Sequence, residues 1–166
     1  DKRAAVQLVD DIGNALNAEQ PIHVVLLEEQ VNRWLAARSE LPSALALDLG
    51  GLRYPQVSFL DGDSVRLAAL AERDGFEVVL SVVCHIEANE AAARATVTEA
   101  SAGEMGAPVD WLLGLVAARV PGAGIEGDAV AAPNEWVWPN GRRRCRIDSV
   151  SVRAGVLECT LTPLGR

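Results

Sequence analysis

Residues 55–102 read PQVSFLDGDSVRLAALAERDGFEVVLSVVCHIEANEAAARATVTEASA, and this stretch decides the fold. Apolar and other residues alternate along it, in runs separated by the turn sequences DGD, RDG and ANE. Alternation with period two, bounded by Asp-Gly turns, is typical of long antiparallel strands that bury one face. In the clearest run every second residue from Phe76 to Ile86 is apolar, and the intervening residues include Val79 and Val83. We therefore expect this run to be a central strand, with both faces at least partly covered.

Three helices are expected around this region. Residues 2–18 carry apolar residues at three- and four-residue spacing, which predicts an amphipathic helix. After Pro21 a short strand is expected over residues 22–26, followed by a second helix over 28–38. A third helix is expected over 108–120, because Pro suits the first position of a helix. This third helix is apolar almost all round, which indicates burial on several sides or contact with a ligand or partner.

The C-terminal part of the chain predicts a hairpin that turns at Ala154-Gly155. The inward-facing residues switch between Ile147 and Val150, which indicates a β-bulge. In that register Cys159 lies opposite Val150 rather than Cys145, so a cross-strand disulfide between the two cysteines is disfavoured.

These patterns together predict an α+β fold. We expect a curved antiparallel β-meander of about six or seven strands, packed on two or three helices. The whole chain, 1–166, is expected to be one domain, in which 1–20 is a leading amphipathic helix and 22–166 is a helix plus the antiparallel sheet.

Composition excludes some classes of function. The chain has 166 residues, 49% of them hydrophobic, and a formal net charge of −8, a balance that repels nucleic-acid phosphates. No run approaches the roughly 18 to 20 apolar residues of a membrane-spanning helix. The chain begins at Asp1 rather than at methionine, so a processed or truncated product is expected, and an N-terminal membrane tether would lie upstream of Asp1. The three cysteines have no metal-ligand spacing and are interpreted as small buried residues.

Nothing in the sequence indicates catalysis, and we expect no catalytic residue, no cofactor and no metal ion. Cys84 and His85 are adjacent, but neighbouring strand residues point to opposite faces and cannot form a nucleophile–base pair. His85 and Glu87 share a face without the cysteines that a zinc deaminase needs. Asp61 and Asp63 are most simply solvated turn residues, since the remaining oxygen ligands of a calcium loop are missing.

Two groups of residues near the C-terminus are candidate contacts with a partner. Arg142, Arg144 and Arg146 share one strand face and could hold an anionic headgroup or an acidic partner; the alternative is a solvated edge neutralised by carboxylates. Trp136 and Trp138 also share a face, which suits a membrane interface or a protein contact, or ordinary hairpin packing. In the third helix the candidate apolar contacts are Trp111 and Leu115.

Two short motifs carry a resemblance to a known group of proteins. They are Glu29-Gln30-Val31-Asn32-Arg33-Trp34-Leu35, in the second helix, and Gly103-Glu104-Met105-Gly106-Ala107-Pro108, before the third. Over residues 22–162 the chain resembles bacterial extracytoplasmic domains of the YpmS-like and LmeA-like class, whose fold is similar to half of a tubular lipid-binding module. The resemblance implies a periplasmic or extracytoplasmic, membrane-associated protein that is tethered by an N-terminal helix.

The function expected from these observations is a non-enzymatic, extracytoplasmic, membrane-associated structural or interaction domain. It would be an accessory subunit or scaffold of a membrane assembly, in contact with a membrane protein complex or a lipid surface. The alternative is a module that binds a lipid or another hydrophobic ligand. A continuous apolar cleft between sheet and helix is expected for the second role, whereas a well-filled core with an exposed apolar patch is expected for the first.

Overall fold

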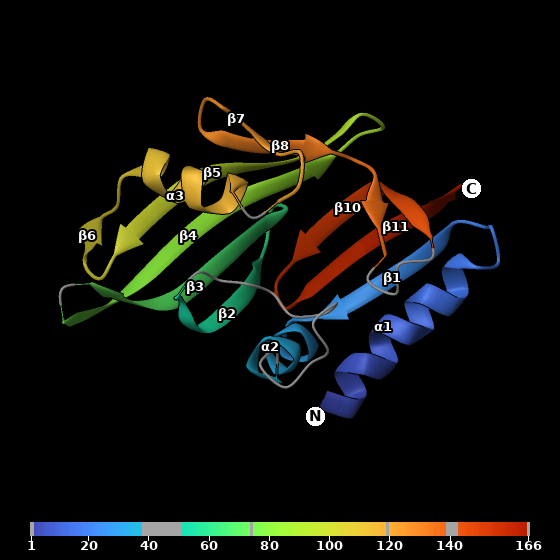
Figure 1. Cartoon of the computed structure of the whole chain (residues 1–166), viewed down its shortest axis with the longest axis horizontal. Coiled ribbons are helices and arrows are strands. Elements are labelled where there is room, and N and C mark those ends of the chain that lie inside the picture. The colour runs from blue at the N-terminus through green and yellow to red at the C-terminus, as the bar shows by residue number, and fades with distance from the viewer. Residues whose placement is uncertain (1, 38–50, 74, 119, 139–142, 166) are drawn as a thin grey trace.

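Figure 1 shows the computed structural model of the chain, which describes residues 2–37, 51–73, 75–118, 120–138 and 143–165. Within these ranges the chain forms two antiparallel sheets and three helices. The larger sheet contains the strands β2 (Arg53–Leu60), β3 (Ser64–Arg73), β4 (Phe76–Ala88), β5 (Ala92–Ala102), β6 (Met105–Gly106), β7 (Gly124–Glu126) and β8 (Ala129–Pro133). The smaller sheet contains β1 (Ile22–Leu27), β9 (Trp136–Val137), β10 (Arg144–Arg153) and β11 (Val156–Leu164). The helices are α1 (Lys2–Leu16), α2 (Glu28–Ala37) and α3 (Val109–Ala117).

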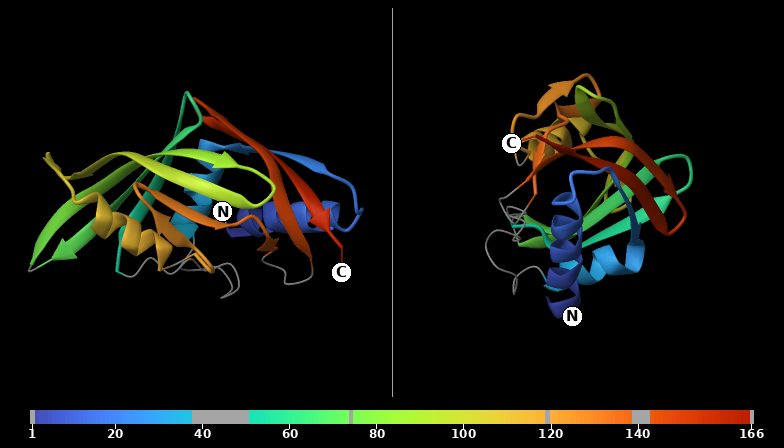
Figure 2. Two further views of the ribbon diagram at one scale, coloured as in Figure 1. Left: turned by 90° about the horizontal axis from the view of Figure 1, so that it is seen from above. Right: turned by 90° about the vertical axis from the view of Figure 1, so that its right-hand side faces the viewer.

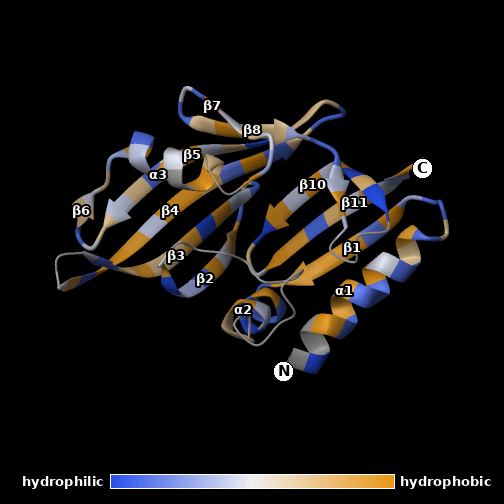
Figure 3. Ribbon diagram, viewed as in Figure 1, coloured by the Kyte–Doolittle hydropathy of each residue, from blue (hydrophilic) through white to orange (hydrophobic). Residues whose placement is uncertain are grey.

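The strands β2 to β5 confirm the expected run of hairpins. The strand order of the larger sheet is β2-β3-β4-β5-β8-β7, with β6 paired to β5, so β4 lies in the interior of the sheet as predicted. The innermost pairs of the three hairpins are Leu60 with Ser64, Arg73 with Phe76, and Ala88 with Ala93, which places the turns at the predicted DGD, RDG and ANE sequences. Figure 3 shows the alternation of hydrophobic and hydrophilic residues along β3 and β4.

The expectation of one sheet needs correction, because the C-terminal hairpin belongs to a second sheet. This sheet has the order β1-β11-β10-β9. Its internal details agree with the prediction, since Val150 pairs with Cys159 and the register of β10 shifts between Ile147 and Ser149. The bulge and the absence of a direct Cys145–Cys159 pairing are therefore confirmed.

The two sheets are joined through the turn between β2 and β3. A carboxylate oxygen of Asp63 accepts a hydrogen bond from the backbone N–H of Val152 at 2.7 Å, and one of Asp61 accepts from Ala154 at 3.0 Å. The N–H of Gly155 also donates to the carbonyl of Phe59 at 3.1 Å. Asp61 and Asp63 are turn residues, as predicted, and Asp61 is exposed. The interpretation was incomplete, because both carboxylates also bind the backbone of the β10–β11 hairpin.

The helix α2 is fixed to the edge of the larger sheet by its polar residues. Asn32 donates to the carbonyl of Val57 and accepts from its N–H, both at 2.8 Å, and Glu28 accepts from the N–H of Phe59 at 2.8 Å. These bonds satisfy the backbone of β2 on the side away from β3, as the outer edge of a sheet requires. Leu35 and Phe59 then pack in one buried cluster.

The helix α1 covers one face of the smaller sheet. Ile12 and Leu16 form a buried cluster with Val24, Cys145 and Leu161. Figure 2 shows α1 lying beside this sheet, away from the long hairpins of the larger one. None of the helices in the described ranges is long and apolar enough to cross a membrane.

Candidate apolar binding cleft

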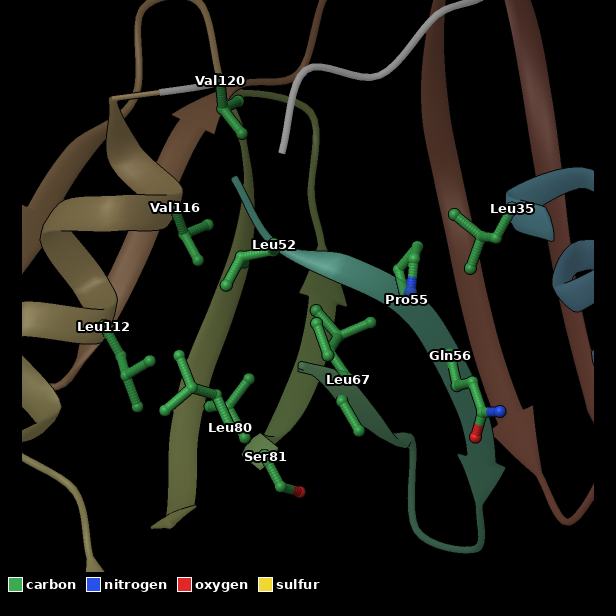
Figure 4. Close-up of a pocket in the computed structure, with 13 residues that line it drawn as sticks. Leu35, Leu52, Pro55, Gln56, Leu67, Leu80, Ser81, Leu112, Val116 and Val120 are labelled. Carbon is green, nitrogen blue, oxygen red and sulfur yellow. The ribbon is translucent and has the colours of Figure 1, made fainter. Parts of the chain in front are cut away.

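The most distinctive feature of the larger sheet is a pocket between its face and α3. The side chains of Leu67, Leu80 and Val82 line it from the sheet, and Leu112 and Val116 line it from the helix. Leu67 pairs with Val82 across β3 and β4, and residues directly opposite each other in antiparallel strands share a face. The period-two pattern of the sequence therefore places these apolar residues together (Figure 4).

A second pocket continues the first one toward the junction of the two sheets. Both pockets have a volume of about 270 Å³, and they share Leu67, Val82, Leu112 and Val116. We call the two together the cleft, with an outer lobe and an inner lobe. The outer lobe is completed by Leu35, Leu52, Pro55, Gln56, Ala68, Ala69, Leu80, Ser81 and Val120. The inner lobe is completed by Phe59, Val65, Cys84, Ile86, Ala95, Val97, Leu113, Val130 and Leu157.

The lining of the cleft offers almost no polar chemistry. Gln56 and Ser81 are the polar residues of the outer lobe, and Figure 4 shows both side chains directed away from α3. In the inner lobe Cys84 is the residue with a titratable group, and burial raises the pKa of its thiol, which keeps it protonated. The cleft can therefore bind hydrocarbon, but it has no group to hold a charged or strongly polar ligand inside.

Of the two predicted contact residues of α3, Trp111 lies beside the cleft rather than in its lining. Trp111 is partly exposed, next to the buried Leu112. Leu115 belongs to the same helix, but its side chain is outside the described residues. The helix itself is shorter than predicted, because Pro108 is its N-cap and Ala118 its C-cap.

Trp136 and Trp138 are half-buried in the smaller sheet. Both pack against the cluster that contains Leu16 and Cys145. The indole N–H of Trp136 donates to Asn134 at 3.1 Å, and that of Trp138 donates to the carbonyl of Val9 at 2.9 Å. These contacts support the packing of β9 and α1, and they place the two tryptophans apart from the cleft.

The arginine cluster is paired with carboxylates in the described part of the chain. Arg144 contacts Glu135 at 3.1 Å, and Arg146 contacts Asp148 at 2.7 Å. Arg142 lies outside the described residues. For Arg144 and Arg146 this arrangement favours the alternative of a neutralised edge over an open anion-binding face.

The two histidines lie on different strands, His23 on β1 and His85 on β4, whereas Cys145 and Cys159 pack in the same core cluster of the smaller sheet. His85 Nδ1 lies 3.1 Å from the carbonyl oxygen of Gly62, and His23 Nε2 lies 3.5 Å from Glu158. Burial raises the pKa of the Cys145 and Cys159 thiols, as it does for Cys84. Among the residues that the structure describes, no three His, Cys, Asp or Glu side chains come together in a group that could hold a metal ion.

The cleft depends on residues that the sequence did not single out as candidates. Alternation placed Leu80, Val82, Cys84 and Ile86 on one face correctly, but it gave no sign that this face is incompletely filled. The available signal was the all-round apolar character of the third helix, which indicated either burial or a ligand.

No protein-family model, no curated protein and no solved structure matches this chain.

Proposed function

We propose that this chain binds the hydrocarbon part of a lipid, or another hydrophobic ligand, in the cleft between the larger sheet and α3. The observation that carries the proposal is the continuity of two apolar pockets through four shared residues. In this proposal β2 to β5 act as one curved meander that wraps the ligand. The protein would be a non-enzymatic, membrane-associated module outside the cytoplasm.

The dimensions of the cleft support an extended acyl chain. The lining runs along β4 from Leu80 in the outer lobe to Ile86 in the inner lobe, a rise of about 20 Å at the usual spacing of a strand. One leaflet of a bilayer contributes about 15 Å of hydrocarbon, half of the bilayer core. Each methylene moved from water into such a site contributes about 0.8 kcal/mol, so a chain filling the cleft would be held without any polar contact.

A charge placed in the cleft tests the proposal. Leu67 lines both lobes and yet is 42% exposed, so Leu67→Glu can fold with its carboxylate near water. We expect this variant to bind cis-parinaric acid, a fluorescent fatty acid, at least about 30-fold more weakly, because several apolar contacts are lost beside a charge. Fluorescence titration of the purified proteins measures the difference.

Val79→Glu is the matched control. Val79 lies on the neighbouring strand, is 51% exposed, and points to the opposite face from Leu80. This variant should bind the fatty acid as the unmodified protein does. Equal affinity in Leu67→Glu and the unmodified protein, with both folded, would show that the cleft is not the binding site.

A structural or interaction subunit of a membrane assembly is the second candidate. The partly exposed Trp111 favours it, since a large aromatic side chain at the surface suits a protein contact. Native mass spectrometry of the purified protein separates the two roles: co-purifying lipid supports the binding module, whereas a lipid-free protein that also fails to bind cis-parinaric acid supports the interaction subunit.

A further inference from the structure

Large apolar side chains are exposed at the end of the larger sheet that lies farthest from the smaller sheet. Phe76 is 77% exposed, Met105 is 72% exposed and Trp111 is 46% exposed. We call these three residues the apolar rim. Figures 1 and 2 both show the end of β3, the start of β4, β6 and the start of α3 at this end of the molecule.

The register of the strands makes the rim a continuation of the cleft. Phe76 and Val78 share a face with Leu80 because they alternate along β4. Met105 pairs with Ala102, and Ala102 pairs with Leu80, so Met105 is on this face too. Trp111 is next to Leu112, which lines both lobes. An apolar path therefore leads from the inner lobe, along β4, to the outermost turn of the sheet.

From this continuity we infer that the apolar rim inserts into the surface of a zwitterionic phospholipid membrane, so that a hydrocarbon chain passes between the membrane and the cleft. The inference rests on the proposed function, because it names the source of the ligand. Aromatic side chains at the interface of a membrane bury their rings at the level of the headgroups, which suits Phe76 and Trp111.

The charges around the rim decide between possible partners. The basic residues at this end are Arg53, which pairs with both Glu72 and Glu77, and Arg73, which is opposite Phe76 in the register of β3 and β4. Within the described ranges Glu104 and Asp110 have no basic partner, so acidic residues outnumber basic ones. This excess of acid repels an anionic membrane. It also opposes a symmetric contact of two rims, since a two-fold pairing brings the acids of one copy toward those of the other. A zwitterionic surface carries no net charge and avoids both penalties.

Sedimentation with vesicles tests the inference. The full chain should bind phosphatidylcholine vesicles and should bind phosphatidylglycerol vesicles less well. Phe76→Glu and Met105→Glu should each lower the partition coefficient by about tenfold or more, because a charge replaces an inserted apolar group. Phe76→Trp should keep the binding, and Val137→Glu, an exposed apolar position in β9, is the matched control that should leave it unchanged.

Fatty-acid binding in the absence of vesicles separates this inference from the proposed function. The rim variants should still bind cis-parinaric acid as the unmodified protein does, whereas Leu67→Glu should bind it at least about 30-fold more weakly. Rim variants that sediment with phosphatidylcholine vesicles as the unmodified protein does would overturn the inference and leave the cleft untouched. Tighter binding to phosphatidylglycerol, or a dimer in solution that the rim variants abolish without any vesicle binding, would also overturn it.

Discussion

Asp148 shows how a single residue stabilises the bulge of β10. It lies where the register shifts between Ile147 and Ser149, and its carboxylate accepts hydrogen bonds from the hydroxyl of Thr162 and from Arg146 Nε. The Thr162 hydroxyl and then the Arg146 guanidinium hold the pKa of this carboxyl below its ordinary value. Because the pKa of Asp148 is lower in the folded than in the unfolded state, its ionised carboxylate stabilises the folded protein at pH values above the ordinary pKa, about 3.9. This stabilisation is lost as the pH falls through the lower pKa of the folded state.

We expect Thr162→Val to raise the pKa of Asp148 toward its ordinary value, because the largest cause of the shift is removed. The free energy of unfolding of the variant should then depend less on pH below about 3.9 than that of the unmodified protein. Carbon NMR titration of the Asp148 carboxyl group measures the pKa directly. Thr160→Val, in the same strand and opposite Ser149, is the control that should leave it unchanged. An unaltered pKa in Thr162→Val would assign the shift to Arg146 alone.

Single residues were the least predictable part of the structure. Asn134 is buried, and its side-chain amide forms four hydrogen bonds. Its NH₂ group donates to the carbonyls of Asn89 and Ile147, and its oxygen accepts from the backbone N–H of Ile147 and the indole N–H of Trp136. In the sequence it is the last residue of the segment PGAGIEGDAVAAPN, which is rich in glycine and proline. These four hydrogen bonds involve three residues, and Asn89 and Ile147 are distant in the sequence, so no local pattern could indicate the bonds to them.

At the scale of elements, the joint between the sheets depends on the turn at Asp61–Asp63. Asp63 has a φ of 55°, a conformation that aspartate tolerates better than most residues, and this conformation lets its carboxylate reach Val152. The backbone N–H of Asp63 also donates to the carbonyl of Val152 at 3.2 Å. The turn therefore acts on β10 through both its side chain and its backbone.

Asp63→Gly should weaken this joint, because glycine accepts the positive φ but cannot accept the hydrogen bond of Val152. We expect a loss of about 1 to 2 kcal/mol in the free energy of unfolding, the usual cost of an unpaired buried N–H. Hydrogen exchange of the Val152 amide should become faster than that of amides within β4. Asp63→Asn keeps an oxygen acceptor and should retain most of the protection; similar exchange of Val152 in both variants would contradict this role of the carboxylate.

Periodicity and turn chemistry were sufficient to predict the local elements. The three turns of β2 to β5, the central place of β4 and the bulge in β10 all follow from residues close together in sequence. The third helix does not extend to Val120 as predicted: Val120 precedes Pro121, and the residue before a proline disfavours the helical conformation. The pairing of β1 with β11 could not be predicted, since it joins Ile22 to Leu161 and alternation does not identify the partner of a strand.

At the scale of the whole molecule, apolar side chains are packed more closely on the smaller sheet than on the larger one. The smaller sheet is covered by α1, and Leu16 and Cys145 there are almost completely buried. On the larger sheet the cluster of Val82, Cys84 and Leu112 stands beside about 270 Å³ of unfilled space in each lobe. Open apolar space forgoes van der Waals contacts, and its presence beside well-packed regions supports the proposal that a hydrophobic ligand binds there.

A larger side chain in the cleft should therefore raise the free energy of unfolding and lower the affinity for a hydrophobic ligand. Ala95 lies on the cleft face of β5 and lines the inner lobe, so Ala95→Leu places additional methyl groups in empty space. We expect the free energy of unfolding in urea to rise by about 1 kcal/mol, the usual gain from filling a cavity, while the affinity for cis-parinaric acid falls. Ala131→Leu, which pairs with Arg94 on the other face, should change neither property greatly. If Ala95→Leu is destabilised and still binds the fatty acid with unchanged affinity, the inner lobe is not open to a ligand. Binding would then involve the outer lobe alone.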